Sequence, residues 1–139
     1  MDQLLIDIKA QIDRYEEVYK TSSIDTLLNA ADWFAIQATR LSENLAELKT
    51  HYNRSYYARK LKVAQKEQEF INKENLSAAK AQSKSIVETA EFLDNELIYQ
   101  SQAYRVDTFL RQVNILIKTI QQRISYLKIE KNNQERSQI

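Results

Sequence analysis

Residues 27–52, LLNAADWFAIQATRLSENLAELKTHY, decide the fold because their apolar side chains recur at alternating steps of four and three residues. The positions that keep this spacing are Leu27, Ala31, Phe34, Ala38, Leu41, Leu45, Leu48 and Tyr52. Such a heptad pattern is typical of a helix that keeps one face against a partner helix over a long distance. The segment therefore predicts a long helix that packs on at least one other helix.

The chain of 139 residues contains no glycine and no proline, the two residues that most often interrupt helices. Breaks must then fall where Ser, Thr and Asn gather, because these side chains cap helix ends. Only residues 20–23 and 72–85 meet that condition. Within them, Ser22 begins one segment that resembles a capping box, closed by Asp25, and Ser85 begins another.

We therefore predict an all-α protein with helices at about residues 2–20, 23–73 and 78–130. The second break is a bend within residues 73–85, with or without a short helix of its own. Asn75 and Ser77 are further candidate caps in this bend. Residues 131–139 form a polar tail that we expect to fray.

Short turns make consecutive helices antiparallel neighbours. The expected fold is a single helical domain, residues 1–139, in which the short first helix packs on a long antiparallel hairpin formed by the second and third helices. We expect a three-helix bundle at the base and a coiled-coil-like pair at the tip, near residues 72–80. The expected core of the base comprises Leu5, Ile8, Ile12, Leu27, Phe34, Leu41, Val113, Ile117, Ile120 and Ile124, with Trp33 at its edge.

The tip carries more apolar residues than a pair of helices can bury. The stripe of the second helix is expected to continue through Tyr56, Tyr57, Leu61, Ala64, Phe70 and Ile71. The stripe of the third helix is expected to begin with Ile86, Ala90, Leu93, Leu97 and Tyr104. Further apolar residues, such as Val63, Phe92 and Ile98, lie beside these stripes. Because exposed apolar patches mark interaction sites, we predict a homo-oligomer or a complex with a protein partner.

The composition argues against most kinds of chemistry. A phosphate-binding loop needs glycine, and a disulfide or a thiolate metal site needs cysteine, which is also absent. His51 is the only histidine, so the chain cannot supply the two Glu-x-x-His motifs of a di-metal bundle. We therefore expect a protein that is not an enzyme, with no catalytic residues, no metal, no cofactor and no small-molecule substrate.

No apolar run approaches the roughly 18 residues of a membrane span. The first residues, MDQLLIDIKAQID, carry charges throughout, unlike a signal peptide. These features predict a cytoplasmic protein that does not bind membranes.

Charge is distributed unevenly, although the net charge is only +1. Residues 1–48 carry four basic and nine acidic side chains, whereas residues 49–84 carry nine basic and three acidic ones. Within this basic block, residues 51–66, HYNRSYYARKLKVAQK, interleave cations with tyrosines. The candidate binding residues are Tyr52, Arg54, Tyr56, Tyr57, Arg59, Lys60, Lys62 and Lys66.

This stretch has two interpretations. Cations neutralise phosphates and aromatic rings stack on bases, so the mixture suits nucleic acid or another binding partner. The alternative is a solvated helix face whose tyrosines pack on the neighbouring helix and whose lysine stems cover apolar surface.

The segment from Ser55 to Glu130 begins with SYYARKLKVAQKEQEF and ends with RISYLKIE. Over about residues 50–130 the chain resembles small all-helical proteins of tailed bacteriophages, with a Tyr-Ala start, a Ser/Ala/Lys-rich turn and a second long helix. That family has no established activity, so the resemblance carries over no functional residues. Its genes often accompany those of phage DNA replication and recombination. The resemblance therefore implies a nucleic-acid-related role by association, and a location in the host cytoplasm.

Two functions follow from these observations. The first is a non-enzymatic helical interaction or assembly protein, phage-encoded and self-associating. The alternative is an accessory nucleic-acid-binding protein of replication or recombination that uses the basic, tyrosine-rich helix face.

Overall fold

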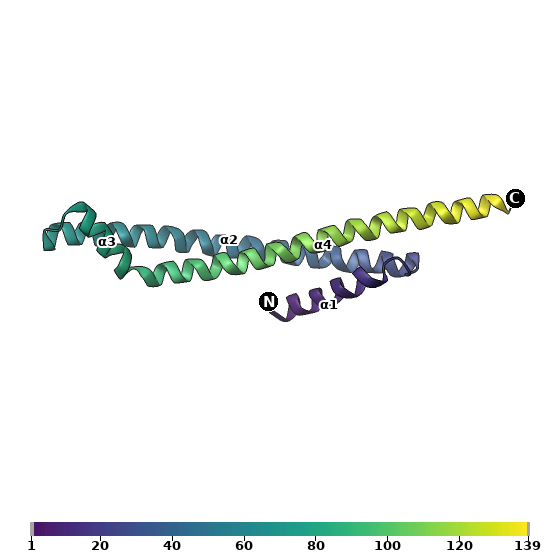
Figure 1. Cartoon of the computed structure of the whole chain (residues 1–139), viewed down its shortest axis with the longest axis horizontal. Helices are drawn as coiled ribbons and strands as arrows, with labels where there is room; N and C mark the ends of the chain where they lie inside the picture. The colour runs from purple at the N-terminus through teal and green to yellow at the C-terminus, as the bar shows by residue number, and fades with distance from the viewer. Residues whose placement is uncertain (1, 139) are drawn as a thin grey trace. The chain divides into compact units, whose positions relative to one another are not determined.

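The computed structural model describes residues 2–138, and these form helices without any strand. The helices are α1 (Asp2–Val18), α2 (Ile24–Glu74), α3 (Ala78–Glu88) and α4 (Ala90–Ser137), in the order shown in Figure 1. The long helix α2 packs against α4. The prediction of an all-α fold with a long packed helix is confirmed.

The chain divides into two compact units. Unit 1 comprises residues 1–44 and 106–139, and unit 2 comprises residues 45–105. Unit 1 therefore holds α1, the first part of α2 and the last part of α4, whereas unit 2 holds α3 and the remaining parts of α2 and α4. The single-domain assignment stays a prediction.

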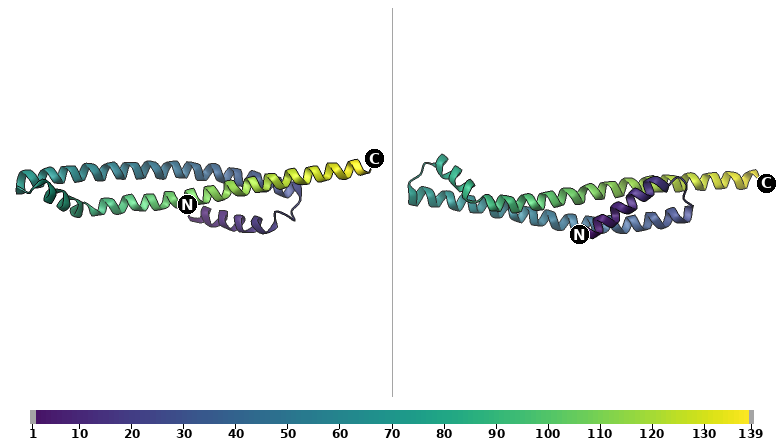
Figure 2. Two further views of the ribbon diagram at one scale, coloured as in Figure 1. Left: turned by 45° about the horizontal axis from the view of Figure 1, so that its top comes forward. Right: turned by 60° about the horizontal axis from the view of Figure 1, so that its bottom comes forward.

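Unit 1 buries an aliphatic core, and α1 runs beside the first part of α2 in both views of Figure 2. Its buried apolar side chains are Leu5, Ile8, Ile12, Leu27, Ala30, Phe34, Leu41, Val106, Val113, Leu116, Ile120 and Ile124. The core predicted for the base is thus confirmed, apart from Ile117, which is half-buried. Trp33 is also half-buried and meets the Phe34 ring edge-on, with ring centroids 5.0 Å apart.

Ser23 caps the N-terminus of α2, one residue later than the predicted capping box. The Thr26 N–H donates to Ser23 Oγ over 3.2 Å, which satisfies one of the unpaired donors of the first turn. The hydroxyl of Ser22 instead donates to the carbonyl of Val18 over 2.8 Å and closes the end of α1.

Asn75 ends α2 in place of the missing glycine. Its φ of 54° lies in the left-handed region, which asparagine tolerates better than most residues other than glycine. The next residue, Leu76, donates its N–H to the carbonyl of Phe70 over 3.3 Å. Ser77 then caps α3 by accepting a hydrogen bond from the N–H of Lys80 over 3.3 Å, as its type predicted.

The prediction of one continuous helix over 78–130 is wrong, because Thr89 separates α3 from α4. Ser85, expected to be a cap, lies inside α3, where its buried hydroxyl donates to the carbonyl of Ala81 over 2.6 Å. Thr89 donates in the same way to the carbonyl of Ser85 over 2.7 Å. A Ser or Thr hydroxyl that donates to the carbonyl four residues earlier often bends a helix. Two such hydrogen bonds, from Ser85 and Thr89, lie next to each other at this break.

The polar tail predicted at residues 131–139 is helical in its described part, because α4 continues to Ser137; its fraying stays a prediction. The sequence IEKNNQERS contains no breaker and is rich in residues that favour helix or tolerate it. Residue 139 lies outside the described part of the chain.

The seam of unit 2, where α2 contacts α3 and α4, mixes polar with apolar residues. The steps of three and four residues continue along α2 through half-buried Leu48, Tyr52, Ser55, Arg59, Lys62 and Lys66 to buried Phe70. The buried residues of α3, the break and the adjoining part of α4 are Ala81, Ser85, Thr89 and Glu96.

Most residues of the apolar stripes expected in this unit are therefore exposed to solvent instead of packed in the seam. Tyr57 is 69% exposed and Leu61 62% exposed, and on α4 Leu93 and Leu97 are 38% and 48% exposed. A continuous helix cannot rotate one segment relative to the next, so the seam follows the heptad spacing rather than the local apolar residues.

Candidate binding surface

The basic, tyrosine-rich stretch lies on α2 within unit 2, and the helix divides its eight residues between two sides. Tyr52, Tyr56, Arg59, Lys62 and Lys66 are half-buried. Arg54, Tyr57 and Lys60 are exposed. The structure therefore does not bring all eight candidate residues onto one open surface.

Tyr56 is the centre of an aromatic and cationic cluster. Its ring stacks with that of Tyr52 at 6.4 Å between centroids and meets Tyr57 edge-on at 5.4 Å. Lys60 Nζ lies 4.7 Å from the same ring centroid, and the Arg59 guanidinium carbon lies 5.5 Å from it. Exposed cation–π contacts contribute about 0.5–1 kcal/mol each. Tyr56 is thus engaged within its own helix, which leaves less of its ring to stack on a base.

Arg59 pairs with Glu96 across the seam of unit 2. Arg59 Nε donates to Glu96 Oε2 over 2.5 Å, and Arg59 Nη2 donates to Glu96 Oε1 over 3.4 Å. The Glu96 side chain is only 7% exposed, and that of Arg59 is 25% exposed. The hydrogen bond that Arg59 donates to Glu96 is the main cause that raises the pKa of Arg59, against the opposing effect of burial. Arg59 is therefore a neutralised seam residue rather than a free phosphate ligand.

Lys66 is also held by acidic neighbours. Its Nζ lies 3.7 Å from Glu69 on the same helix and 4.0 Å from Glu88 at the end of α3. Arg59 and Lys66 thus place two basic side chains of α2 against Glu96 of α4 and Glu88 of α3. The basic character predicted from the sequence therefore serves, in part, to hold unit 2 together.

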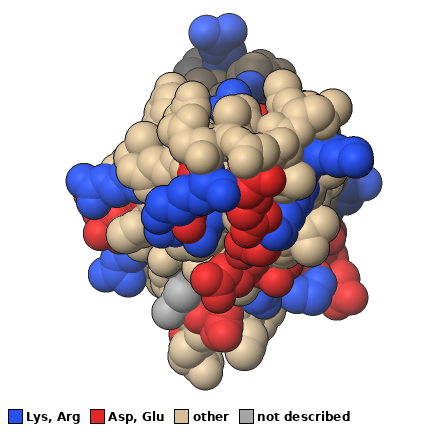
Figure 3. Space-filling view, turned by 90° about the vertical axis from the view of Figure 1, so that its left-hand side faces the viewer, with Lys and Arg blue, Asp and Glu red and all other residues tan. Residues whose placement is uncertain are grey.

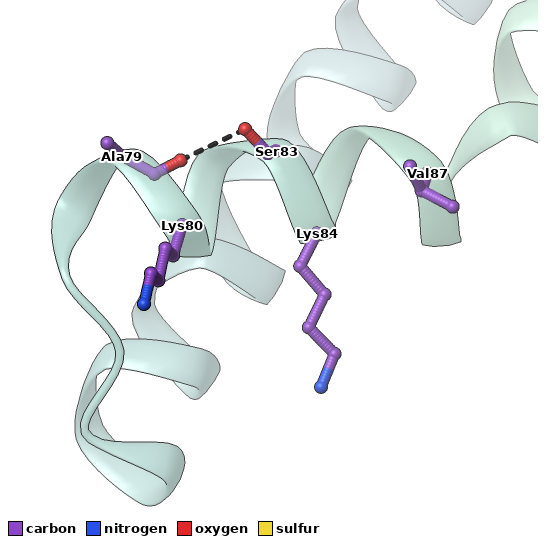
Figure 4. Close-up of a pocket in the computed structure, with 5 residues that line it drawn as sticks. All are labelled: Ala79, Lys80, Ser83, Lys84 and Val87. Carbon is purple, nitrogen blue, oxygen red and sulfur yellow. Dashed lines mark hydrogen bonds between the residues drawn. The ribbon is translucent and has the colours of Figure 1, made fainter.

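A shallow hollow on α3 is lined by Ala79, Lys80, Ser83, Lys84 and Val87 (Figure 4). Ser83 Oγ donates to the Ala79 carbonyl over 3.1 Å, which is the dashed bond in Figure 4. Lys84 Nζ pairs with Glu74 over 2.7 Å and lies 4.5 Å from the centroid of the Phe70 ring. All five lining residues come from one helix, so the hollow is an open groove along its surface.

The hydrogen bond to Glu74 is the main cause that raises the pKa of Lys84. A raised pKa means that the folded chain holds this proton more tightly than the unfolded chain does. The contact therefore stabilises the fold at pH values below 10.5, the ordinary value for lysine, and this contribution is lost as the pH rises past the folded value.

Figure 3 looks onto the end of unit 2 where α2 passes into α3. Lysine and arginine side chains are interspersed there with aspartate and glutamate, and no continuous basic surface covers this face. Such mixing matches the ion pairs of Lys66 and Lys84 and is unlike the single-sign patch typical of nucleic-acid-binding surfaces.

His51 stacks on Tyr99 of α4, with ring centroids 5.2 Å apart and an angle of 16° between the planes. Across residues 2–138, no three His, Cys, Asp or Glu side chains are grouped closely enough to hold a metal ion.

Two features of unit 2 were not predicted from the sequence. The first is the set of polar residues in the seam, which includes buried Ser85, Thr89 and Glu96. The second is the pair of exposed aliphatic rows that the seam leaves outside. Strict extension of the heptad spacing beyond Tyr52 gives Ser55, Arg59 and later positions. The spacing therefore predicts the seam positions, but it is hard to recognise because polar residues occupy them.

Comparison with protein-family models, curated protein sequences and solved structures finds no match to this chain. The resemblance to tailed-phage proteins therefore stays a prediction. Among the described helices, none has the length and apolar character needed to cross a bilayer.

Proposed function

We propose that this chain is a non-enzymatic helical assembly protein that associates with copies of itself. In this account unit 1, as a three-helix base, provides stability through its aliphatic core. Unit 2, as a two-helix tip completed by α3, provides the surface that meets a partner.

One observation carries this proposal: in unit 2, polar residues occupy several seam positions while apolar residues are exposed. Its seam contains the buried carboxylate of Glu96, while large aliphatic side chains are exposed to solvent. Those exposed by a third or more include Leu61, Ile86, Val87, Leu93, Leu97 and Ile98. Covering apolar surface contributes roughly 25 cal/mol per Å². Exposed apolar surface of this kind favours an interface over a freely solvated helix pair.

The proposal predicts a solution mass that depends on concentration. Light scattering over a hundredfold range of protein concentration should give more than one chain at the upper end, with dissociation on dilution. A mass of one chain throughout that range would contradict self-association.

The alternative function, an accessory nucleic-acid-binding protein, is favoured by the exposed side of α2 in unit 2. Arg54, Tyr57 and Lys60 are exposed there, so two cations flank an aromatic ring that is accessible to a base. The engagement of Arg59 and Lys66 by carboxylates reduces the charge that remains for phosphates.

This alternative is tested with a single-stranded oligonucleotide. Binding through phosphates should weaken steeply between low and moderate salt. Charge reversal at Arg54 and Lys60 should abolish binding and leave helicity unchanged, because neither residue forms an ion pair within the described chain. Reversal of Arg59 is a poor test, since it would also release Glu96 inside the seam. Affinity that is unchanged by salt would exclude this function.

A further inference from the structure

Unit 2 presents two exposed apolar rows on different helices. The α2 row comprises Tyr57, Leu61 and Ala64, and the α4 row comprises Ala90, Leu93 and Leu97. At about 100° per residue, each row covers an arc of roughly 60° on its helix. Each row lies away from the seam that joins the two helices within the unit.

The charges beside the two rows are opposite. Arg54 and Lys60 are exposed beside the α2 row, and Glu91 and Asp94 are exposed beside the α4 row. None of these four side chains forms an ion pair among the described residues. Pairing two α4 rows would bring acidic side chains together, and pairing two α2 rows would bring basic side chains together. Only the pairing of an α2 row with an α4 row joins opposite charges.

The register within unit 2 shows how such a pairing would fit. There α2 and α4 run antiparallel, with Arg59 opposite Glu96, and Lys66 lies opposite Glu88 of α3. The same antiparallel register between the two outer rows sets Tyr57 opposite Leu97 and Leu61 opposite Leu93. The apolar positions of the two rows therefore match in this register.

We propose that the partner of this surface is a second copy, and that the α2 row of one copy docks on the α4 row of the next. This inference rests on the proposed self-association and adds its geometry. Each contact joins two different rows. Copies that repeat this contact in one direction form rings or open chains, whereas two copies that exchange rows reciprocally form a twofold dimer.

The decisive experiment blocks one row at a time. Leu61→Lys removes the α2 row, and Leu97→Lys removes the α4 row. Both residues are largely exposed, so circular dichroism should show unchanged helicity. Each variant alone should associate at least about tenfold more weakly than the wild type, because a lysine cannot be buried unpaired. An equimolar mixture should form a heterodimer and stop there, since each variant supplies the row that the other lacks.

Three outcomes would overturn the inference. The first is a Leu61→Lys variant that assembles like the wild type, which would leave α4 rows pairing with each other. The second is a mixture that shows no heterodimer. The third is equal loss of assembly in Ile115→Lys, the matched control, whose isoleucine is 65% exposed on the part of α4 in unit 1. A wild type that is monomeric would instead refute the proposed function itself.

Charge reversal provides a second test that does not disturb the apolar rows. Lys60→Glu and Asp94→Lys should each weaken assembly by about threefold to tenfold, because each reverses a charge beside one row. Assembly as strong as that of the wild type in both variants would show that charge does not select the pairing of the two rows.

Discussion

At the scale of single residues, the Arg59–Glu96 pair is the most informative contact of unit 2. Glu96 occupies a buried seam position, and Arg59 supplies two donors to its carboxylate. A buried ion pair offsets the cost of desolvation only partly, but removing one partner leaves the other uncompensated. The pair therefore matters more for which helix faces meet than for the total stability.

Removing either partner should destabilise the chain, whereas removing both should not. Arg59→Leu or Glu96→Leu is expected to lower the free energy of unfolding by about 1–3 kcal/mol, allowing for the partial exposure of Arg59. The double variant is expected to lie within about 1 kcal/mol of the wild type, or above it. Urea denaturation measures all three. A double variant as unstable as the sum of the single ones would show that the two side chains act independently.

At the scale of helices and turns, the sequence predicts where helices begin and end better than it predicts which side they bury. The heptad of residues 27–52 and the gathering of Ser, Thr and Asn correctly located α2 and the end near Asn75. Thr89 was missed, since Ser85 and Thr89 as residue types suit both a cap and a hydroxyl that bonds back to its own helix. Only the buried position of Ser85 separates these two roles.

Asn75 should respond to substitution in a way that a helical asparagine does not. Asn75→Gly should keep or slightly raise stability, and Asn75→Ala should cost about 1 kcal/mol because alanine resists positive φ. Asn72→Ala is the matched control, since Asn72 lies exposed within α2 and alanine favours helix. Thermal unfolding followed by circular dichroism compares them, and equal effects at both positions would contradict the role assigned to Asn75.

At the scale of the whole molecule, the two units differ in what holds them together. Unit 1 has the aliphatic core that the sequence predicted, because its apolar residues and its heptad positions coincide. In unit 2 the apolar residues and the heptad positions do not coincide. Ser55 and Arg59 occupy heptad positions, whereas Tyr57 and Leu61 are exposed to solvent. This is why the candidate binding surface could be assigned from sequence only in part, with Arg59 and Lys66 turned to the seam and Arg54, Tyr57 and Lys60 exposed.

Unit 1 should therefore carry most of the stability. Leu41 and Ile120 are fully buried, so Leu41→Ala and Ile120→Ala should each cost about 2–5 kcal/mol. Ile115→Ala, at an exposed position of the same part of α4, should cost less than about 0.5 kcal/mol. Urea denaturation measures these differences, and a near-zero cost at both buried positions would mean that the core is elsewhere.

We propose that the exposed apolar rows of unit 2 serve assembly rather than nucleic-acid binding. Sedimentation velocity of the wild-type chain at low salt, with and without a single-stranded oligonucleotide, tests it most directly. The account predicts a protein mass above one chain that falls on dilution and does not change when the oligonucleotide is added. A single-chain mass that rises only in the presence of the oligonucleotide would contradict it.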